Sequence, residues 1–307
     1  MKILDSIEEL SGLKGPIVLA AGTFDGLHLG HQALIRRAMD EASSLGGTAV
    51  VMTFDRHPAT LLRPANAPSL LTRNETKISL LWEMGVQALL LLPFTWELAS
   101  VPARDFVASL VTAAVPLHSI CVGNQWSFGK GGEGDLGLLE ILGKESGFSV
   151  IQIPPIEERG TPISSTRIRT SIGEGDLEDA KACLGRPYLL TGTVVTGQRL
   201  GKTIGFPTAN LDVAGMQLPP DGVYAFRVSL DGSVLSGVCN IGVRPTVDAS
   251  ASHRTVEAHL FDLSKDLVGK VLGLVFVRFL RGERKFSGLE ELKAQITCDC
   301  IAAREIL

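Results

Sequence analysis

The stretch that decides the fold lies at residues 17–31, which run IVLAAGTFDGLHLGH. It begins with the apolar run Ile17–Ala21, which predicts a buried strand. Gly22 and Gly26 punctuate a turn, and the pattern over residues 29–39 predicts a helix after it. A strand, a glycine turn and a helix in this order are typical of the first unit of an α/β fold.

The rest of the N-terminal half repeats this alternation. Strand-like apolar runs follow at residues 48–54, 87–92, 119–123 and 148–153, with helix-like stretches at 104–114 and 176–184. Gly185 and Pro187 mark the end of the last helix. Short apolar strands separated by helices predict a Rossmann-like parallel sheet covered on both faces.

The pattern changes after residue 186. Strand-like runs now follow one another directly, at residues 188–196, 223–230, 234–241, 255–261 and 271–280. Asp231 and Gly232 form a turn signal between two of them, and residues 288–307 have the spacing of an amphipathic helix. Consecutive strands predict an antiparallel barrel, so we expect an α/β domain at 1–186 and an all-β domain with a terminal helix at 187–307.

Composition limits the class of protein. The 307 residues suffice for two domains, and the net charge of −4 comes with no basic stripe, so we expect no nucleic-acid or membrane partner. The five cysteines are odd in number and contain no paired CxxC motif, which favours inert thiols in a reducing compartment. No apolar run approaches the roughly 18 residues of a membrane span, and the start MKILDSIEEL does not resemble a signal peptide. We therefore expect a cytoplasmic protein.

The glycine turn is a candidate phosphate site. The N-terminus of a helix presents unpaired N–H groups and the positive end of the helix dipole. Gly22 and Gly26 let the backbone approach a ligand closely. His28 and His31 are three residues apart and share one face of the first helical turn, where their rings can donate hydrogen bonds to a triphosphate.

A second polar string, ISSTRIR, occupies residues 163–169. Hydroxyls at a helix start cap the helix and can also bind phosphate oxygens. Arg169 can neutralise the charge that develops on a leaving pyrophosphate. With the glycine–histidine turn upstream, the two strings predict one nucleotide site.

Another glycine-rich segment lies in the C-terminal half, where residues 192–197 run GTVVTG and residues 200–211 run LGKTIGFPTANL. Closely spaced glycines let backbone N–H groups point at phosphates. Thr208 and Asn210 offer the neutral oxygens that suit Mg²⁺. Glu257 lies in an apolar strand, where it is either a solvent-facing residue or the carboxylate that accepts a proton from an attacking hydroxyl.

These motifs resemble those of known families. The paired strings of the N-terminal half resemble the nucleotidyltransferases, and more closely the FMN adenylyltransferase module of bifunctional bacterial riboflavin kinase/FAD synthetases. TFDRHP at 53–58 and GNQWSFG at 123–129 add to this likeness. GFPTAN at 205–210 and nearly all of 187–307 resemble the riboflavin kinases, whose fold is a six-stranded barrel with a C-terminal helix.

The resemblance implies a set of site residues. The catalytic residues it implies are Glu257, as the base, with His28 and His31. The nucleotide-binding residues it implies are Gly22, Phe24, Asp25, Gly26, Gly30, Ser164, Ser165, Thr166, Arg169, Gly197, Gly201, Lys202, Gly205 and Pro207. The flavin contacts it implies are Gln125, Trp126, Asn240 and Arg244, and the ligands of Mg²⁺ are Thr208 and Asn210.

The expected activity has two steps, in which ATP phosphorylates riboflavin to FMN and then adenylylates FMN to FAD with release of pyrophosphate. Two alternatives remain at this point: a riboflavin kinase with weak or lost adenylyl transfer, and a flavin-binding protein with neither activity. Arg56, Gln125 and Trp126 stand where the family usually has proline, asparagine or aspartate, and phenylalanine. These departures predict slower adenylyl transfer than phosphorylation. The oligomeric state is not predicted.

Overall fold

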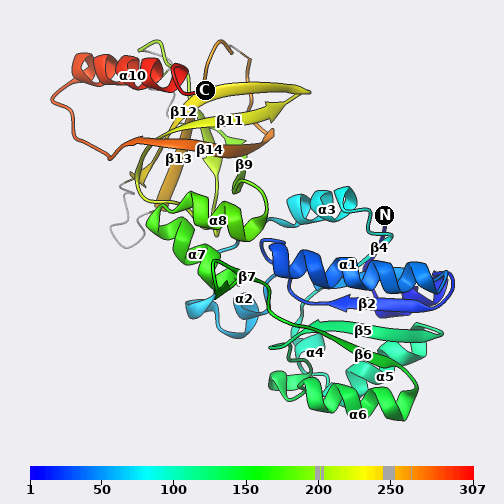
Figure 1. The fold of residues 1–307 in the computed structure, drawn as a ribbon. Coiled ribbons are helices and arrows are strands. Elements are labelled where there is room, and N and C mark those ends of the chain that lie inside the picture. The colour runs from blue at the N-terminus through cyan, green and yellow to red at the C-terminus, as the bar shows by residue number, and fades with distance from the viewer. Residues whose placement is uncertain (198–200, 202–203, 245–252, 264) are drawn as a thin grey trace. The chain divides into compact units, whose positions relative to one another are not determined.

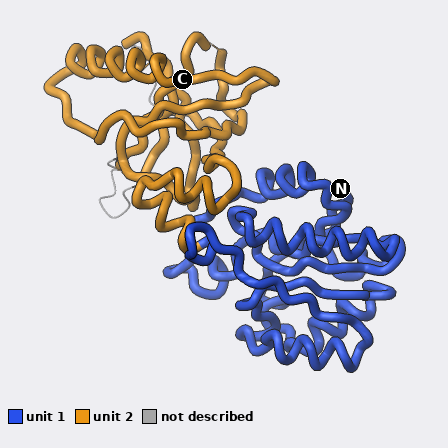
Figure 2. Tube along the Cα trace, viewed as in Figure 1, with its two compact units in different colours: residues 1–165 blue, residues 166–307 orange. Residues whose placement is uncertain are grey.

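The computed structural model describes residues 1–307 except 198–200, 202–203, 245–252 and 264 (Figure 1). The chain divides into two compact units, residues 1–165 and 166–307 (Figure 2). The helices between residues 166 and 184 group with the second unit. The division of functions at residue 186 stays a prediction.

The first unit contains a six-stranded parallel sheet in the order β1-β4-β3-β2-β5-β6. Its strands are β1 (Lys2–Leu4), β2 (Ile17–Ala21), β3 (Thr48–Phe54), β4 (Ala88–Leu92), β5 (Leu117–Gly123) and β6 (Ser149–Ile153). The predicted Rossmann-like sheet is confirmed. Strand β1 was not predicted, because three residues are too short for a periodic signal.

Helices cover both faces of this sheet. The main ones are α1 (Leu29–Ser44), α3 (Asn74–Glu83), α5 (Ala103–Ala113) and α6 (Leu136–Ser146). Shorter elements are η1 (Ile7–Gly12), α2 (Pro58–Leu62), η2 (Pro64–Asn66), α4 (Trp96–Ala99), η3 (Lys130–Gly132) and the ribbon of β7 (Glu157–Glu158) and β8 (Thr161–Pro162).

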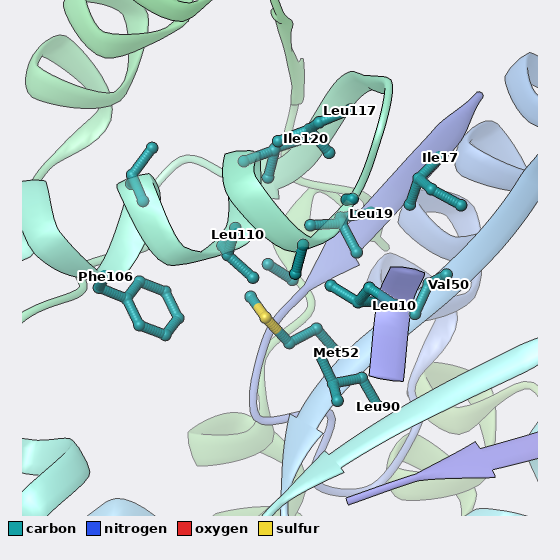
Figure 3. Close-up of a cluster of buried hydrophobic side chains, with 14 of the residues drawn as sticks. Leu10, Ile17, Leu19, Val50, Met52, Leu90, Phe106, Leu110, Leu117 and Ile120 are labelled. Carbon is teal, nitrogen blue, oxygen red and sulfur yellow. The ribbon is translucent and has the colours of Figure 1, made fainter. Parts of the chain in front are cut away.

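Successive residues of each strand enter opposite cores. Ile17 and Leu19 pack with Leu110 and other side chains of α5, in the cluster drawn in Figure 3. Val18, between them, packs against the α1 side, in a cluster that includes Ile35. Because both faces are buried, the strands read as continuous apolar runs with no alternation of polar residues.

The second unit contains helices α7 (Ser165–Glu174) and α8 (Leu177–Leu184) and a closed barrel. Asp176 caps α8, and Gly185 ends it with φ of 71°. The barrel order is β10-β13-β12-β11-β14-β9, for strands β9 (Leu189–Val195), β10 (Ala209–Asp212), β11 (Gly222–Leu230), β12 (Ser233–Arg244), β13 (His253–Leu260) and β14 (Val271–Arg281). The turn between β11 and β12 has positive φ at Asp231 and Gly232, as a tight hairpin requires.

One barrel strand overlaps a predicted motif. Strand β10 (Ala209–Asp212) begins with the last two residues of GFPTAN and pairs with β13 and β9, which closes the barrel. The pattern of apolar runs missed it, because the strand is four residues long and half polar. The terminal helix α10 (Leu289–Arg304) contributes Ala303 to a small core with Val223 and Phe261. In the described part of the chain, no helix has the length and apolar character to cross a membrane.

Candidate active sites

The loop between β2 and α1 has a strained backbone. Phe24 and Leu27 have φ of 49° and 43°, in the left-handed region that favours glycine, and Gly26 has φ of 86°. A non-glycine residue in that region costs on the order of 1 kcal/mol. The side chains of Phe24 and Leu27 are fully buried, and each burial stabilises by about 1.5–3 kcal/mol. Core packing therefore holds the loop in its unusual shape.

Asp25 anchors this loop to the segment that precedes α3. Its carboxylate is buried and accepts hydrogen bonds from the backbone N–H of Leu71, at 3.0 and 3.1 Å, and of Thr72, at 3.1 Å. It lines a cavity of about 220 Å³ together with Asp55 and Lys77. The structure thus gives the carboxylate of Asp25 a structural partner in the segment before α3.

The two predicted histidines lie against each other. The rings of His28 and His31 are stacked, with centroids 3.5 Å apart, and Nδ1 of His28 accepts the backbone N–H of His31 at 3.3 Å. An accepting Nδ1 in a neutral imidazole leaves the proton on Nε2, so His28 is set up as a donor there. Burial first, then the neighbouring His28 and Lys77, lowers the pKa of His31 well below its usual value. His31 is therefore neutral, and its buried Nδ1 has no hydrogen-bond partner among the described residues.

A cavity of about 540 Å³ opens beside these rings. Predicted residues from four parts of unit 1 line it: Gly22, Phe24, His28, His31, Gln125, Trp126, Ser164 and Ser165. The hydroxyl of Ser165 donates to the carbonyl of Asp25 at 2.9 Å, which brings ISSTRIR to the glycine–histidine loop. The start of the second motif therefore lies against the first; that the two motifs form one nucleotide site stays a prediction.

Other predicted residues do not line this cavity. Gly26 and Gly30 are absent from its wall. A Cβ at Gly30 would lie 3.2 Å from the ring of His28, so glycine there makes room for the histidine. Thr166 and Arg169 lie in α7, in unit 2, so their position relative to the cavity stays a prediction.

Part of the wall of this cavity is aromatic. Trp126 stacks on Phe128, with ring centroids 4.5 Å apart, and Phe54 meets Phe94 edge to face at 5.0 Å. All four rings line the cavity. A planar, largely apolar ring system such as a flavin suits this wall, while phosphates suit the loop side.

The barrel presents a row of polar residues across three strands. Asn210 on β10 pairs with Glu257 on β13, which pairs with Asn240 on β12. Directly opposed residues of neighbouring strands have side chains on the same face, with Cβ atoms about 4.5–5.5 Å apart. Glu257 is half-buried and its neighbours Val256 and Ala258 are fully buried, so the row lies outside the barrel core. The amide of Asn240 also donates to Glu283 at 3.1 Å.

Two cavities flank this row. One, of about 230 Å³, includes Gly201, Thr208, Asn240 and Glu257 among its lining residues. The other, of about 240 Å³, is lined by Gly197, Pro207, Thr208 and Asn210, together with the apolar side chains Leu260, Leu263, Leu267 and Val268. Thr208 lines both cavities. A nucleotide on one side and an alcohol on the other would meet at the oxygens of Thr208 and at Glu257.

The structure does not place three predicted contacts of the C-terminal half at these two cavities. Gly205 does not line either cavity, but its φ of 92° requires glycine in the loop before Pro207. Lys202 lies outside the described residues. Arg244 is the last residue of β12, and the structure does not describe its side chain.

The sequence did not single out two buried ionic groups. Arg281 binds Asp299 of α10 through three hydrogen bonds of 2.7–3.2 Å at the edge of the 230 Å³ barrel cavity. Lys77, on α3, is only 6% exposed. A signal existed for Lys77, because it lies four residues before Leu81, on the buried face of the helix. A charged side chain on the buried face of a helix needs a hydrogen-bond or charge partner.

The fold and its two sites define the class as transferases of phosphorus-containing groups, with one site in each unit. Two family models match the chain half by half: FAD synthetase over residues 12–167 and riboflavin kinase over residues 184–307. The chain belongs to the bifunctional riboflavin kinase/FMN adenylyltransferase family.

Individual relatives cover nearly the whole chain. A bifunctional riboflavin kinase/FMN adenylyltransferase of Escherichia coli K12 is 38% identical over 307 residues, 99% of this chain and 97% of that protein. A protein of the same name from Bacillus subtilis 168 is 36% identical, over 92% of this chain and 90% of that protein. A crystal structure described as a macrolide-efflux protein of Streptococcus pneumoniae has a TM-score of 0.81 at 29% identity and covers 99% of both chains.

Proposed function

We propose that the chain phosphorylates riboflavin to FMN in its barrel unit and adenylylates FMN to FAD in its α/β unit, each time with ATP. The observation that carries this proposal is the gathering of two separate sets of predicted residues, one at the cavity of unit 1 and the other at the two cavities of the barrel. A flavin-binding protein without activity has no use for a carboxylate opposite Asn210. The alternative without adenylyl transfer conflicts with the intact pairing of the two N-terminal motifs.

In the barrel, Glu257 acts as the general base. Its carboxylate accepts the proton of the primary hydroxyl of riboflavin as that oxygen attacks the γ-phosphorus of ATP, and ADP leaves. Gly197 and Pro207 contact the nucleotide, whereas Asn240 contacts the flavin.

Thr208 and Asn210 fit a magnesium ion. They are neutral oxygen donors that line one cavity, as a hard cation prefers. Mg²⁺ keeps most of its ligands from water and phosphate, so two protein oxygens suffice. When bound, the ion neutralises charge on the β- and γ-phosphates.

In the α/β unit, a phosphate oxygen of FMN attacks the α-phosphorus of ATP, and pyrophosphate leaves. That oxygen is already ionised near neutral pH, so the residues need only position the reactants and neutralise charge. His28, His31 and the backbone of the Gly22–Phe24 segment bind the triphosphate. The aromatic wall with Trp126 holds the flavin.

One incubation tests the whole proposal. The purified chain is mixed with riboflavin, ATP and Mg²⁺, and the flavins are separated by chromatography over time. FMN followed by FAD supports both activities, FMN alone would remove adenylyl transfer, and unchanged riboflavin would remove both.

Two variants assign the activities to the sites. E257Q keeps the shape of the side chain but not the base, so FMN formation should fall ~10²–10⁴-fold while FAD formation from added FMN stays normal. H28A should give the reverse pattern. A kinase rate within a few-fold of wild type in E257Q would exclude Glu257 as the base.

A further inference from the structure

Lys77 is a buried cation beneath the phosphate-binding loop. Its ammonium group donates to the carbonyl oxygen of Thr23 at 3.2 Å, and the hydroxyl of Thr53 donates to the same oxygen at 3.0 Å. A lysine is seldom buried to this extent without a charge partner or a function. Here two donors from different elements, α3 and β3, converge on one carbonyl of the loop.

Because these two hydrogen bonds hold the carbonyl of Thr23, they also fix the direction of the N–H group of Phe24. In a trans peptide the C=O and the following N–H point in opposite directions. With the carbonyl of Thr23 turned toward Lys77, the N–H of Phe24 points away from Lys77. No described residue accepts a hydrogen bond from the backbone N–H of Thr23 or Phe24, and both residues line the 540 Å³ cavity beside His28 and His31. Such N–H groups are ready donors for an anion.

The positive charge of Lys77 also affects the groups beside the cavity. The nearby carboxylates already accept backbone N–H groups, Asp25 from Leu71 and Asp55 from Phe94 at 2.8 Å. The ammonium group contributes to lowering the pKa of His31, so its field reaches the ring that faces the cavity. Burial lowers the pKa of Lys77 itself, whereas Asp25 and Asp55 oppose that shift and favour the charged form.

We propose that Lys77 is a positioning residue for adenylyl transfer, which orients the Thr23–Phe24 peptide so that its N–H binds the triphosphate of ATP and places a positive charge behind that peptide. This inference rests on the proposed adenylyl transfer. It adds a residue outside the two motifs, acting through the loop and not by contact with the reacting atoms.

The test compares variants that separate charge from hydrogen bonding. K77M removes both with little change in volume, and T53V removes only a hydrogen bond to the same carbonyl. K77R keeps the charge, and the adjoining 220 Å³ cavity gives the larger side chain room. K144M is the matched control, because Lys144 is exposed on α6 and lines neither cavity of unit 1.

The measurement is FAD formation from FMN, with ATP and FMN varied in turn. In K77M we expect kcat/KM for ATP to fall about 10²-fold, the size typical for loss of one preorganised donor. KM for FMN should stay unchanged, which a general distortion of unit 1 would not allow. T53V should lose less, K77R should recover most of the loss, and K144M should equal wild type.

Several outcomes would overturn the inference. They are an unchanged kcat/KM for ATP in K77M, a loss in T53V equal to that in K77M, or a K77R variant as impaired as K77M. If wild type itself forms no FAD, the proposed adenylyl transfer fails instead, so the two failures are distinguishable. Riboflavin phosphorylation by the barrel of each variant should be unchanged.

Discussion

Replacing Gly197 by alanine should disable riboflavin phosphorylation without unfolding the barrel. A Cβ at Gly197 would lie 2.1 Å from Nδ2 and 2.5 Å from Cγ of Asn210, whereas real Cβ atoms essentially never approach other atoms within 3.0 Å. The amide of Asn210 must therefore move by roughly 1 Å or more. The backbone of Gly197 is outside the positive-φ region, so alanine can adopt it without strain.

A shift of this size is decisive for a metal ligand. Mg²⁺ demands near-ideal octahedral geometry with ligand distances of about 2.0–2.1 Å, so under the proposed role of Asn210 its displaced amide would no longer hold the ion. Misplacing a catalytic group by about 1 Å can cost ~10²-fold in rate. We expect a loss of that order in kcat/KM, with the Mg²⁺ concentration for half-maximal rate raised. The free energy of unfolding should change by no more than about 1 kcal/mol, as for other substitutions near the surface.

The assay is the initial rate of FMN formation as a function of Mg²⁺ concentration, with the unfolding temperature measured in parallel. G288A is the matched control, because a Cβ at Gly288 meets open space. FAD formation from added FMN serves as a second control in the same sample. A G197A variant with a normal unfolding temperature, normal rate and normal Mg²⁺ dependence would refute Asn210 as a ligand and the reason given for glycine at 197.

Three further predictions concern other parts of the chain. Gln125 and Trp126 line the cavity of unit 1 and are larger than the residues that the family usually has there. The double variant Q125N/W126F should therefore raise kcat/KM for FMN in FAD formation, and no gain would mean that the departures are tolerated variation. A fragment of residues 187–307 should fold and phosphorylate riboflavin, and a longer fragment, 166–307, tests whether α7 and α8 are needed. A folded fragment that forms no FMN would refute the assignment of the kinase activity to residues 187–307. Since His31 is neutral in the fold, only the unfolded chain takes up its proton below pH ~6.5, so the stability of unit 1 should fall as pH drops from about 7.5 to 5.5. H31N should weaken this fall in the unfolding midpoint, and an equal fall in both proteins would count against a buried neutral His31.

The sequence predicted the parallel sheet because its strands are buried on both faces, and runs such as Ala88–Leu92 then have no polar interruption. It missed β10 for the opposite reason. That strand has four residues, of which Asn210 and Asp212 are polar, so the pattern of apolar residues gives no signal there. The six-stranded barrel was expected only through the family resemblance.

For the sites, motif strings predicted which residues gather but not what each one does. The nucleotide contact expected of Asp25 stays a prediction, and the motif did not indicate that its carboxylate accepts the N–H groups of Leu71 and Thr72, which lie 46 and 47 residues away in the chain. The position of Lys77 beneath the loop depends on how α3 packs, which no local pattern encodes. Long-range contacts of single polar side chains leave little trace in one sequence.

The strand that carries Asn210 also joins β9 to β13. If β10 were lost, two neighbouring strands would present unpaired N–H and C=O groups to solvent, which is a template for association with other chains. The strand that carries the proposed magnesium ligand Asn210 therefore also protects the barrel from association with other chains. Variants in which this segment is disrupted should aggregate during expression, before any enzyme assay is possible. A barrel designed without this activity would still need a strand at this position.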